Sequence, residues 1–298
     1  MSTRSTEVSS ELAAAGRSMA RRRGRNARRP WVSLGILALF VLTGVLGPWL
    51  APHPPNAIDL AHATEPPVFA GGGMGHLLGT DHLGRDVLSR VLSGARVSLL
   101  VAVGAVLLAG LIGTTVALLA GYVGGRLDMV LTRAADASMA FPVLLLGIVI
   151  VALYGASIVV VIMVIVLGAW PQYARVLRSE VIRVRGQAFV RMSTVLGGGP
   201  WWSMTRHVLP NIIPTFLVLA TLQVGLSIVA EGSMSFLGIG VPLPDASWGN
   251  MLADGRSYMR NAWWLSVIPG AALSLTVVAA NLTGDWLRQH LDPATRRR

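Results

Sequence analysis

The chain of 298 residues carries 25 basic and 14 acidic side chains, giving a formal net charge of +11, and every basic residue is arginine. Only 13% of the residues are charged, about half the share usual in soluble domains, while 53% are hydrophobic. This composition excludes an ordinary soluble enzyme and a disordered chain, and the absence of cysteine excludes a disulfide framework and a Cys-ligated metal.

The first predicted element is an Arg-rich arm over residues 1–30. Such an arm can bind nucleic acid, or it can act as a topology signal held at anionic lipid. We prefer the second interpretation, with no nucleic-acid partner, because the arm directly precedes an apolar segment. That segment, residues 31–51, is longer than the core of a signal peptide and is expected to remain as a membrane anchor, the first span.

Uncharged stretches predict the membrane spans, since a helix needs roughly 20 apolar residues to cross a bilayer. Four stretches are long enough for one crossing each: residues 31–51, 97–125, 207–230 and 261–284. A longer stretch, residues 137–174, holds two helices if the first begins near Met129 and the chain turns at residues 154–156. The prediction is an all-α, polytopic membrane protein with six transmembrane helices.

The arginine distribution predicts the orientation, because short cytoplasmic loops retain positive charge. With the N-terminus inside, 20 arginines fall on the inner side and five on the outer side. Both termini, including a tail at residues 295–298, are therefore expected in the cytoplasm. The segment 52–96 becomes an extracytoplasmic loop, residues 231–260 form a second outer segment, and the loop 176–211 lies inside.

Small side chains recur every four residues within the second span, which predicts a closely packed helix face. The members are Ala105, Ala109, Gly113, Ala117 and Gly121. The alternative is that Ala and Gly are simply common in membrane helices. Pro142 and Pro269 are expected to kink their helices.

A few polar residues are candidates for the translocation path or for structural pairs. Asp136, near the inner end of the third span, either lines the path or pairs with a neighbour such as Arg133. Glu231, at the outer end of the fifth span, is either close to an outer gate or a helix-end carboxylate. His76 and His82 are too weak a pattern to predict a metal site.

The inner loop is unusually apolar for a cytoplasmic linker and predicts two short helices broken at residues 197–199. Pro200 would occupy the first position of the second helix, where proline is well tolerated. An interfacial helix lying on lipid is the alternative. Because an apolar face is unfavourable in water, such a hairpin needs either lipid or a protein partner to cover that face.

Within this loop the chain resembles a known family. Arg191-Met192-Ser193, Gly197 and His207-Val208-Leu209-Pro210 have the spacing of the EAA loop of ABC importer permeases. The chain is most similar to the C-type permeases of dipeptide, oligopeptide and nickel importers, the DppC/OppC group. The segment before the second span also looks like that group's GTDxLGRD signature, in which the matching residues are Gly79, Thr80, Asp81, Gly84, Arg85 and Asp86. From its charges, this segment is expected to form a self-paired turn that caps a helix from Arg85 to Ser93.

The resemblance implies an ABC type I importer permease, with residues 97–294 as the permease core and the loop 176–211 as the coupling loop. It implies that coupling to the ATPase involves Arg191, Met192, Ser193, Gly197, Gly198, Gly199, Pro200, Trp201, Trp202, His207, Leu209 and Pro210. Arg191 stands where the family has glutamate, so any family salt bridge from that position cannot form unchanged.

The same resemblance implies the partners: a second, DppB/OppB-like permease, two ATPase subunits or domains, an extracytoplasmic binding protein and the lipid of a bacterial inner membrane. The chain would form half of a pore for dipeptides or oligopeptides. Nickel chelates, haem or another peptide-like solute are alternative cargoes. ATP and Mg²⁺ would bind the partner subunits, with no cofactor in this chain.

The chain itself is not expected to be an enzyme, because a phosphate-binding loop requires a lysine and the sequence has none. An intramembrane aspartyl protease would need a pair such as Asp136 and Asp285, but the Gly-x-Gly-Asp motif is absent. An ion-coupled secondary transporter would need paired intramembrane charges, and only Asp136 is available.

Overall fold

The computed structural model describes residues 31–291, and within this range the chain is helical, with one isolated β-bridge and no strand. The Arg-rich arm and the tail at residues 295–298 lie outside the described residues. The long helices are α2 (Trp31–Leu50), α3 (Val87–Leu118), α6 (Ile158–Arg185), α9 (Leu209–Phe236) and α11 (Trp264–Leu291). The shorter ones are α4 (Gly125–Met139), α5 (Val143–Tyr154), α7 (Ala188–Val195), α8 (Pro200–Ser203) and α10 (Trp248–Gly255).

The membrane spans agree with the prediction of six. Five helical segments between residues 31 and 291 are long and apolar enough to cross a bilayer, and α4 with α5 make a sixth if this bent pair is one span. The two helices meet at 84°, so the kink expected at Pro142 is a full break of the helix. The turn predicted at residues 154–156 is confirmed, because α5 ends at Tyr154 and Gly155 has a positive φ of 81°.

Several helices extend beyond the uncharged stretches. The helix expected from Arg85 to Ser93 is present but does not end there, since α3 begins at Val87 and runs on without a break to Leu118. Likewise α6 continues to Arg185, because its residues Leu177, Val181 and Val184 remain buried past the apolar span. Charge therefore marks where a helix leaves the apolar layer, and packing decides where the helix ends.

The centre of the bundle is the contact between α3 and α6. The predicted stripe of small residues on α3 is buried, and a side chain at Gly113 would meet the backbone oxygen of Trp170 at 2.7 Å. A similar approach occurs at Gly121, against Val181. The small residues thus let the two backbones pack closely, as predicted, and van der Waals contact stabilises the pair within lipid.

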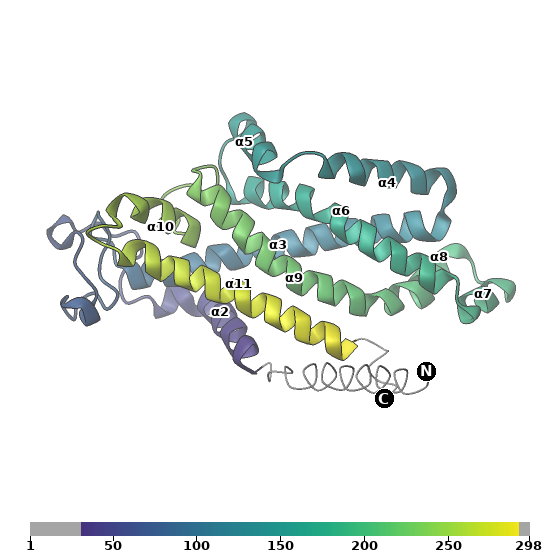
Figure 1. The fold of residues 1–298 in the computed structure, drawn as a ribbon, viewed down its shortest axis with the longest axis horizontal. Helices are drawn as coiled ribbons and strands as arrows, with labels where there is room; N and C mark the ends of the chain where they lie inside the picture. Colours follow the sequence, from purple (N-terminus) through teal and green to yellow (C-terminus); the bar gives the residue numbers. More distant parts are fainter. Residues whose placement is uncertain (1–30, 292–298) are drawn as a thin grey trace, which may run out of the picture.

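The helices alternate in direction, so the connecting segments gather at two ends of the molecule (Figure 1). The loop between α2 and α3 lies at one end together with α10, drawn on the left, while α7 and α8 lie at the opposite end. A second apolar core joins α2, α3, α10 and α11, where the rings of Phe40 and Trp248 are 5.4 Å apart. The helix α11 runs through Pro269 as one continuous element.

Candidate functional site

The segment predicted to couple to an ATPase forms a compact hairpin at the end of α6. The chain turns at Gly186, forms α7, turns again at residues 196–199 and enters α8. The expectation of two separate short helices is only half right. The helix α7 is separate, but α8 continues through a π-helical turn at Met204–Val208 into α9, so residues 200–236 form one span.

The three glycines of the second turn have different roles. Gly197 adopts a positive φ of 88°, a conformation that favours glycine over other residues. At Gly198 an added Cβ would lie 2.7 Å from Oγ and 2.8 Å from the carbonyl oxygen of Ser193. A side chain at Gly199 would meet nothing within 4 Å, and Pro200 opens α8 at a position that suits proline. The turn therefore requires glycine at two of the three positions.

The inner face of the hairpin is fixed to the bundle. Val190 of α7 and Val208 are buried in the same apolar core as Val184 near the end of α6. Between the two arms, the hydroxyls of Ser193 and Ser203 lie 3.4 Å apart within hydrogen-bonding distance. Because both arms are anchored in this way, a displacement of the hairpin would be transmitted to α6 and α9.

The outer face of the hairpin is exposed and apolar. We call this face the apolar tip; it consists of Met192, Val195, Leu196, Trp201 and Trp202. Leu196 is 83% exposed and Trp201 is 71% exposed. An exposed patch of large apolar side chains at the end of a rigid hairpin is typical of a surface that binds another protein or lipid.

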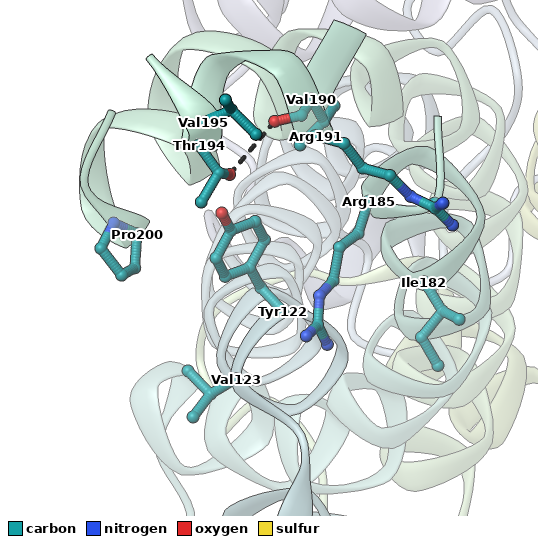
Figure 2. A pocket seen from close by; sticks show the side chains of 10 residues that line it. Tyr122, Val123, Ile182, Arg185, Val190, Arg191, Thr194, Val195 and Pro200 are labelled. Carbon is teal, nitrogen blue, oxygen red and sulfur yellow. Dashed lines mark hydrogen bonds between the residues drawn. The ribbon is translucent and has the colours of Figure 1, made fainter. Parts of the chain in front are cut away.

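A groove of about 850 Å³ lies beside α7, between the hairpin and the end of α3 (Figure 2). Its charged lining residues are Arg185 and Arg191. The Arg185 guanidinium lies 5.5 Å from the ring centroid of Tyr122, in a cation–π contact. Arg191, which stands where the resembled family has glutamate, lines the same groove, so both charged residues of its lining are cations.

His207, Leu209 and Pro210 make the transition from the hairpin into α9. The His207 ring lies edge-on to Trp202, with centroids 4.8 Å apart, and also contacts Phe189 at 5.9 Å. Leu209 and Pro210 begin α9, where the missing proline N–H is tolerated. The histidine therefore links the apolar tip to the start of the span through ring packing.

Asp136 is paired, but with a different residue from the one suggested by the sequence. It accepts a hydrogen bond of 2.8 Å from Arg175 on α6, rather than pairing with Arg133 one turn away. A second pair, missed by the sequence reasoning, joins Asp128 to Arg178 through two hydrogen bonds of 2.5 Å. This pair could have been expected from the sequence, because the two residues have opposite charges and lie at the facing ends of two predicted spans. Together the pairs hold α4 against α6.

Glu231 is fully buried inside α9, five residues before the helix ends at Phe236. Its carboxylate accepts hydrogen bonds from Ser98 of α3 at 3.1 Å and from Ser235 at 2.7 Å. The hydroxyl of Ser247, which caps α10, is a further partner. Glu231 thus connects α3, α9 and α10 and is enclosed by the chain.

Replacing Glu231 by alanine is expected to lower the free energy of unfolding by roughly 1–3 kcal/mol, because it leaves buried hydroxyls without their acceptor. Glu231→Gln retains an acceptor oxygen and should cost less. Thermal unfolding of the purified protein in detergent measures both. Ser233→Ala, on the exposed side of the same helix, is the control; equal effects of Glu231→Ala and Ser233→Ala would contradict the role of the network.

The GTDxLGRD segment forms a self-paired turn, as predicted, and caps α3. Asp81 accepts hydrogen bonds from the backbone N–H of Leu83 and Arg85 and from Nε of Arg85 at 2.6 Å. Asp86 caps α3 by accepting from the backbone N–H of Ser89 at 2.8 Å. The two aspartates therefore have separate tasks, one in the turn and one at the helix end.

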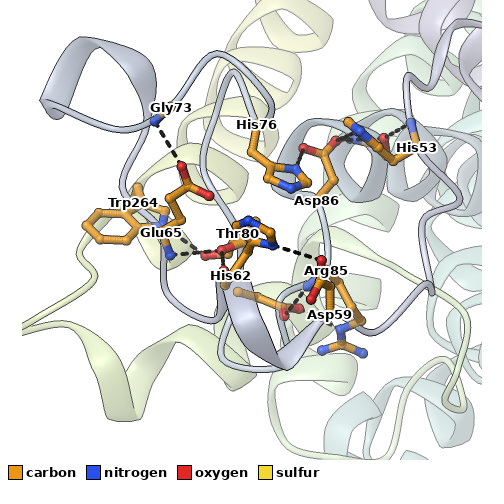
Figure 3. A network of polar contacts seen from close by, with 12 residues as sticks. His53, Asp59, His62, Glu65, Gly73, His76, Thr80, Arg85, Asp86 and Trp264 are labelled. Carbon is orange, nitrogen blue, oxygen red and sulfur yellow. Dashed lines mark hydrogen bonds and ion pairs between the residues drawn. The ribbon is translucent and has the colours of Figure 1, made fainter.

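The same segment is tied to the other end of the chain (Figure 3). Trp264, at the start of α11, donates to the backbone oxygen of Thr80 at 3.2 Å. Arg85 and the almost completely buried Arg90 lie 3.4 and 3.9 Å from Asp254 of α10. The signature thus joins the loop 51–86 to α10 and α11, a role that spacing along the chain did not indicate.

Two glycines and two further histidines of this loop have identifiable contacts. Gly79 and Gly84 both have positive φ, and a side chain at Gly84 would overlap the backbone oxygen of Asp59. A hydrogen bond with His62 lowers the pKa of Asp59, and the same bond raises the pKa of His62. His82 stacks on Tyr258 with centroids 5.1 Å apart.

Comparison with known proteins gives two family matches. The family described as "Binding-protein-dependent transport system inner membrane component" matches residues 113–297. The family described as "N-terminal TM domain of oligopeptide transport permease C" matches residues 17–67. These matches cover the predicted first span and almost all of the predicted permease core.

Curated bacterial proteins are similar over most of their length. The probable D,D-dipeptide transport system permease protein DdpC of Escherichia coli is 38% identical over 87% of this chain and 85% of its own. The nickel transport system permease protein NikC of E. coli is 40% identical over 88% and 93%. The di/tripeptide permease DppC of Pseudomonas aeruginosa is 38% identical over 86% and 85%. The chain therefore belongs to the binding-protein-dependent transport system inner membrane component family, in its oligopeptide permease C group.

Proposed function

We propose that this chain forms half of the translocation pore of an ATP-driven importer of dipeptides or oligopeptides. The proposal is supported by relatives named as D,D-dipeptide, di/tripeptide and glutathione permeases. A relative named as a nickel permease keeps metal chelates as the alternative cargo, beside haem or another peptide-like solute. The second half of the pore would be a similar, DppB/OppB-like permease.

The single observation that carries the mechanism is the anchored hairpin with an exposed apolar tip. ATP and Mg²⁺ would bind two separate ATPase subunits or domains, whose closure moves the tip. Because the hairpin continues directly into the spans of α6 and α9, its displacement would tilt both spans and change access to the pore. Leu196 and Trp201, the most exposed members of the tip, would enter the groove of the ATPase.

The hairpin end would face the cytoplasm of a bacterial cell, and the loop 51–86 the outside. This orientation is supported by the arginines Arg126, Arg133, Arg175, Arg178, Arg183, Arg185, Arg191 and Arg206, all on elements that converge near the hairpin. An extracytoplasmic binding protein would deliver the cargo to the loop 51–86 and to the segment before α11.

Asp136 is proposed to act along the path, and the enclosed Glu231 at its outer gate. Asp136 and its partner Arg175 are both partly exposed on the chain, with side-chain exposures of 43% and 58%. In the complete importer this surface would face the pore or the second permease. Glu231 would act at an outer gate, because its hydrogen bonds cross from α9 to α3 and to the cap of α10.

The test is uptake of a labelled dialanine dipeptide into proteoliposomes that contain the complete importer. We expect uptake to require ATP and Mg²⁺ on the hairpin side and to persist when an uncoupler removes the proton gradient. An importer that stops with the uncoupler while ATP is held constant would instead be an ion-coupled carrier.

A second arm separates the coupling assignment from the cargo. Leu196→Asp, which places a charge on the apolar tip, is expected to reduce both co-purification of the ATPase and ATP-dependent uptake. Leu196→Met, which keeps a large apolar side chain at the same exposed position, is the matched control. If Leu196→Asp retains the ATPase and normal uptake, the coupling assignment is wrong, whereas ATP-driven uptake of nickel but not dipeptide would revise only the cargo.

A further inference from the structure

Two histidines and one aspartate converge on the outer loop without belonging to the coupling machinery (Figure 3). His53 follows α2, His76 lies in the middle of the loop, and Asp86 is the cap of α3. One ligand atom of each lies within 4.8 Å of the others. From this convergence we propose that His53, His76 and Asp86 form a binding site for a divalent transition-metal ion of the Zn²⁺ class.

The geometry suits three ligands around one ion. Nδ1 of His76 lies 3.0 Å from Oδ1 of Asp86, and Nδ1 of His53 lies 3.9 Å from Oδ2. Zn²⁺ with bonds of about 2.0–2.1 Å at tetrahedral angles would place its ligand atoms about 3.3 Å apart. The two His–Asp separations involve different carboxylate oxygens and lie on either side of that value, while all three ligand atoms lie within 4.8 Å of one another. Rotation of the side chains would therefore have to shorten the longer separations when the ion binds.

The ligands are held by their surroundings. The carboxylate of Asp86 is nearly inaccessible and accepts hydrogen bonds from the N–H and hydroxyl of Ser89. The same hydroxyl accepts a hydrogen bond of 3.1 Å from the backbone N–H of His53. Ser89 therefore positions two of the three ligands, as partners outside the coordination sphere commonly do. Prolines on both sides of His53 restrict its backbone further.

The donor atom of His53 has no other use in the described part of the chain. Its Nδ1 is buried and lacks a hydrogen-bond partner there, although buried nitrogen atoms normally have one. By contrast, Nδ1 of His62 is bound to Asp59 at 2.8 Å. Nδ1 of His82 is also buried and unpartnered within residues 31–291, but its ring stacks on Tyr258 and lies outside the group of converging ligand atoms. Convergence on Asp86, rather than the unpartnered nitrogen alone, therefore distinguishes His53 and His76 from the other histidines of the same loop.

Imidazole and carboxylate together favour Zn²⁺ or a neighbouring transition metal over Ca²⁺ or Mg²⁺, which prefer oxygen ligands. Three protein ligands leave a fourth position, and the side chain of His53 is 41% exposed. Because the partial positive charge at the start of α3 opposes a cation, we expect weaker binding than in a closed structural zinc site. The ion would join the end of α2 to the loop and to the start of α3.

The test uses the complete importer, purified through a tag without histidine and treated with chelator. After equilibration with Zn²⁺ and removal of free metal, elemental analysis should find one extra zinc per complex relative to His53→Asn or His76→Asn. The control His82→Asn should retain it. Loading with Co²⁺ should give the strong visible absorption of a four-coordinate site, absent from the His53→Asn and His76→Asn variants.

Because the bound ion would join three segments of the chain, it should also stabilise the folded protein, and the unfolding temperature tests this. Zn²⁺ should raise the unfolding temperature of the wild-type complex and of His82→Asn, but not that of the double variant His53→Asn/His76→Asn. Zinc retained equally by the double variant, or no retained zinc in the wild type, would overturn the proposal. Neither readout depends on transport, so a wrong cargo or coupling assignment leaves this test intact.

Discussion

Gly198→Val is expected, on the proposed coupling role of the hairpin, to reduce ATP-dependent uptake at least about tenfold, which corresponds to only about 1.4 kcal/mol of lost interaction with the ATPase. A side chain at this position would lie 2.7–2.8 Å from two oxygen atoms of Ser193, so the turn must open and the apolar tip must move. The nearest neighbours of the added side chain belong to Ser193 and Trp202, so the hairpin anchors at Val190 and Val208 should keep the helices in place.

Gly199→Val is the matched control, one residue away. Space around Gly199 is open, and its extended backbone before Pro200 suits a β-branched residue. Uptake and ATPase activity are measured together in proteoliposomes, with membrane insertion followed by the yield of folded complex. Equal losses in both variants would mean that side-chain volume in the turn, rather than the contact with Ser193, controls coupling.

Gly113→Ala is expected to destabilise the bundle by roughly 1–3 kcal/mol, the usual range for overpacking a well-packed core. The added methyl group would approach the backbone oxygen of Trp170 at 2.7 Å and the nitrogen of Ala174 at 3.0 Å. Backbone atoms cannot rotate away as a side chain can, so α3 and α6 must separate. The loss should appear as a lower unfolding temperature and a lower yield of folded protein.

Gly104→Ala tests the same helix pair at a more tolerant position. There the nearest atom is Cδ1 of Ile162 at 3.1 Å, the end of a flexible side chain that can adopt another rotamer. We expect a much smaller change in unfolding temperature than for Gly113→Ala. A larger loss for Gly104→Ala would show that close backbone approach is not what the small residues of α3 provide.

The sequence predicted those features that depend on local chemistry. Long uncharged stretches located the spans, since the cost of placing charge in a bilayer applies whatever the tertiary fold. The turn at Gly155, the break at Pro142 and the required glycine at Gly197 follow from the backbone preferences of these two residue types. The recurrence of small residues every four positions also predicted that this face of α3 is buried.

Other features required the three-dimensional arrangement. Asp136 had a neighbour of opposite charge at Arg133, yet its partner is Arg175, 39 residues away along the chain. The end of α6 could not be located from charge, because burial of Val184 keeps the helix regular past the apolar span. A local pattern shows which partners are possible and does not choose among them.

The outer loop shows most clearly which features follow from the sequence and which require the tertiary structure. Composition and spacing determined that this protein is a helical membrane protein with an apolar hairpin between two spans, because hydrophobicity, proline and glycine act over a few residues. Only the folded structure decided that His76 approaches His53 rather than His82, and that Glu231 accepts from Ser98. These contacts join segments far apart in the chain, and their geometry arises from the packing of whole helices.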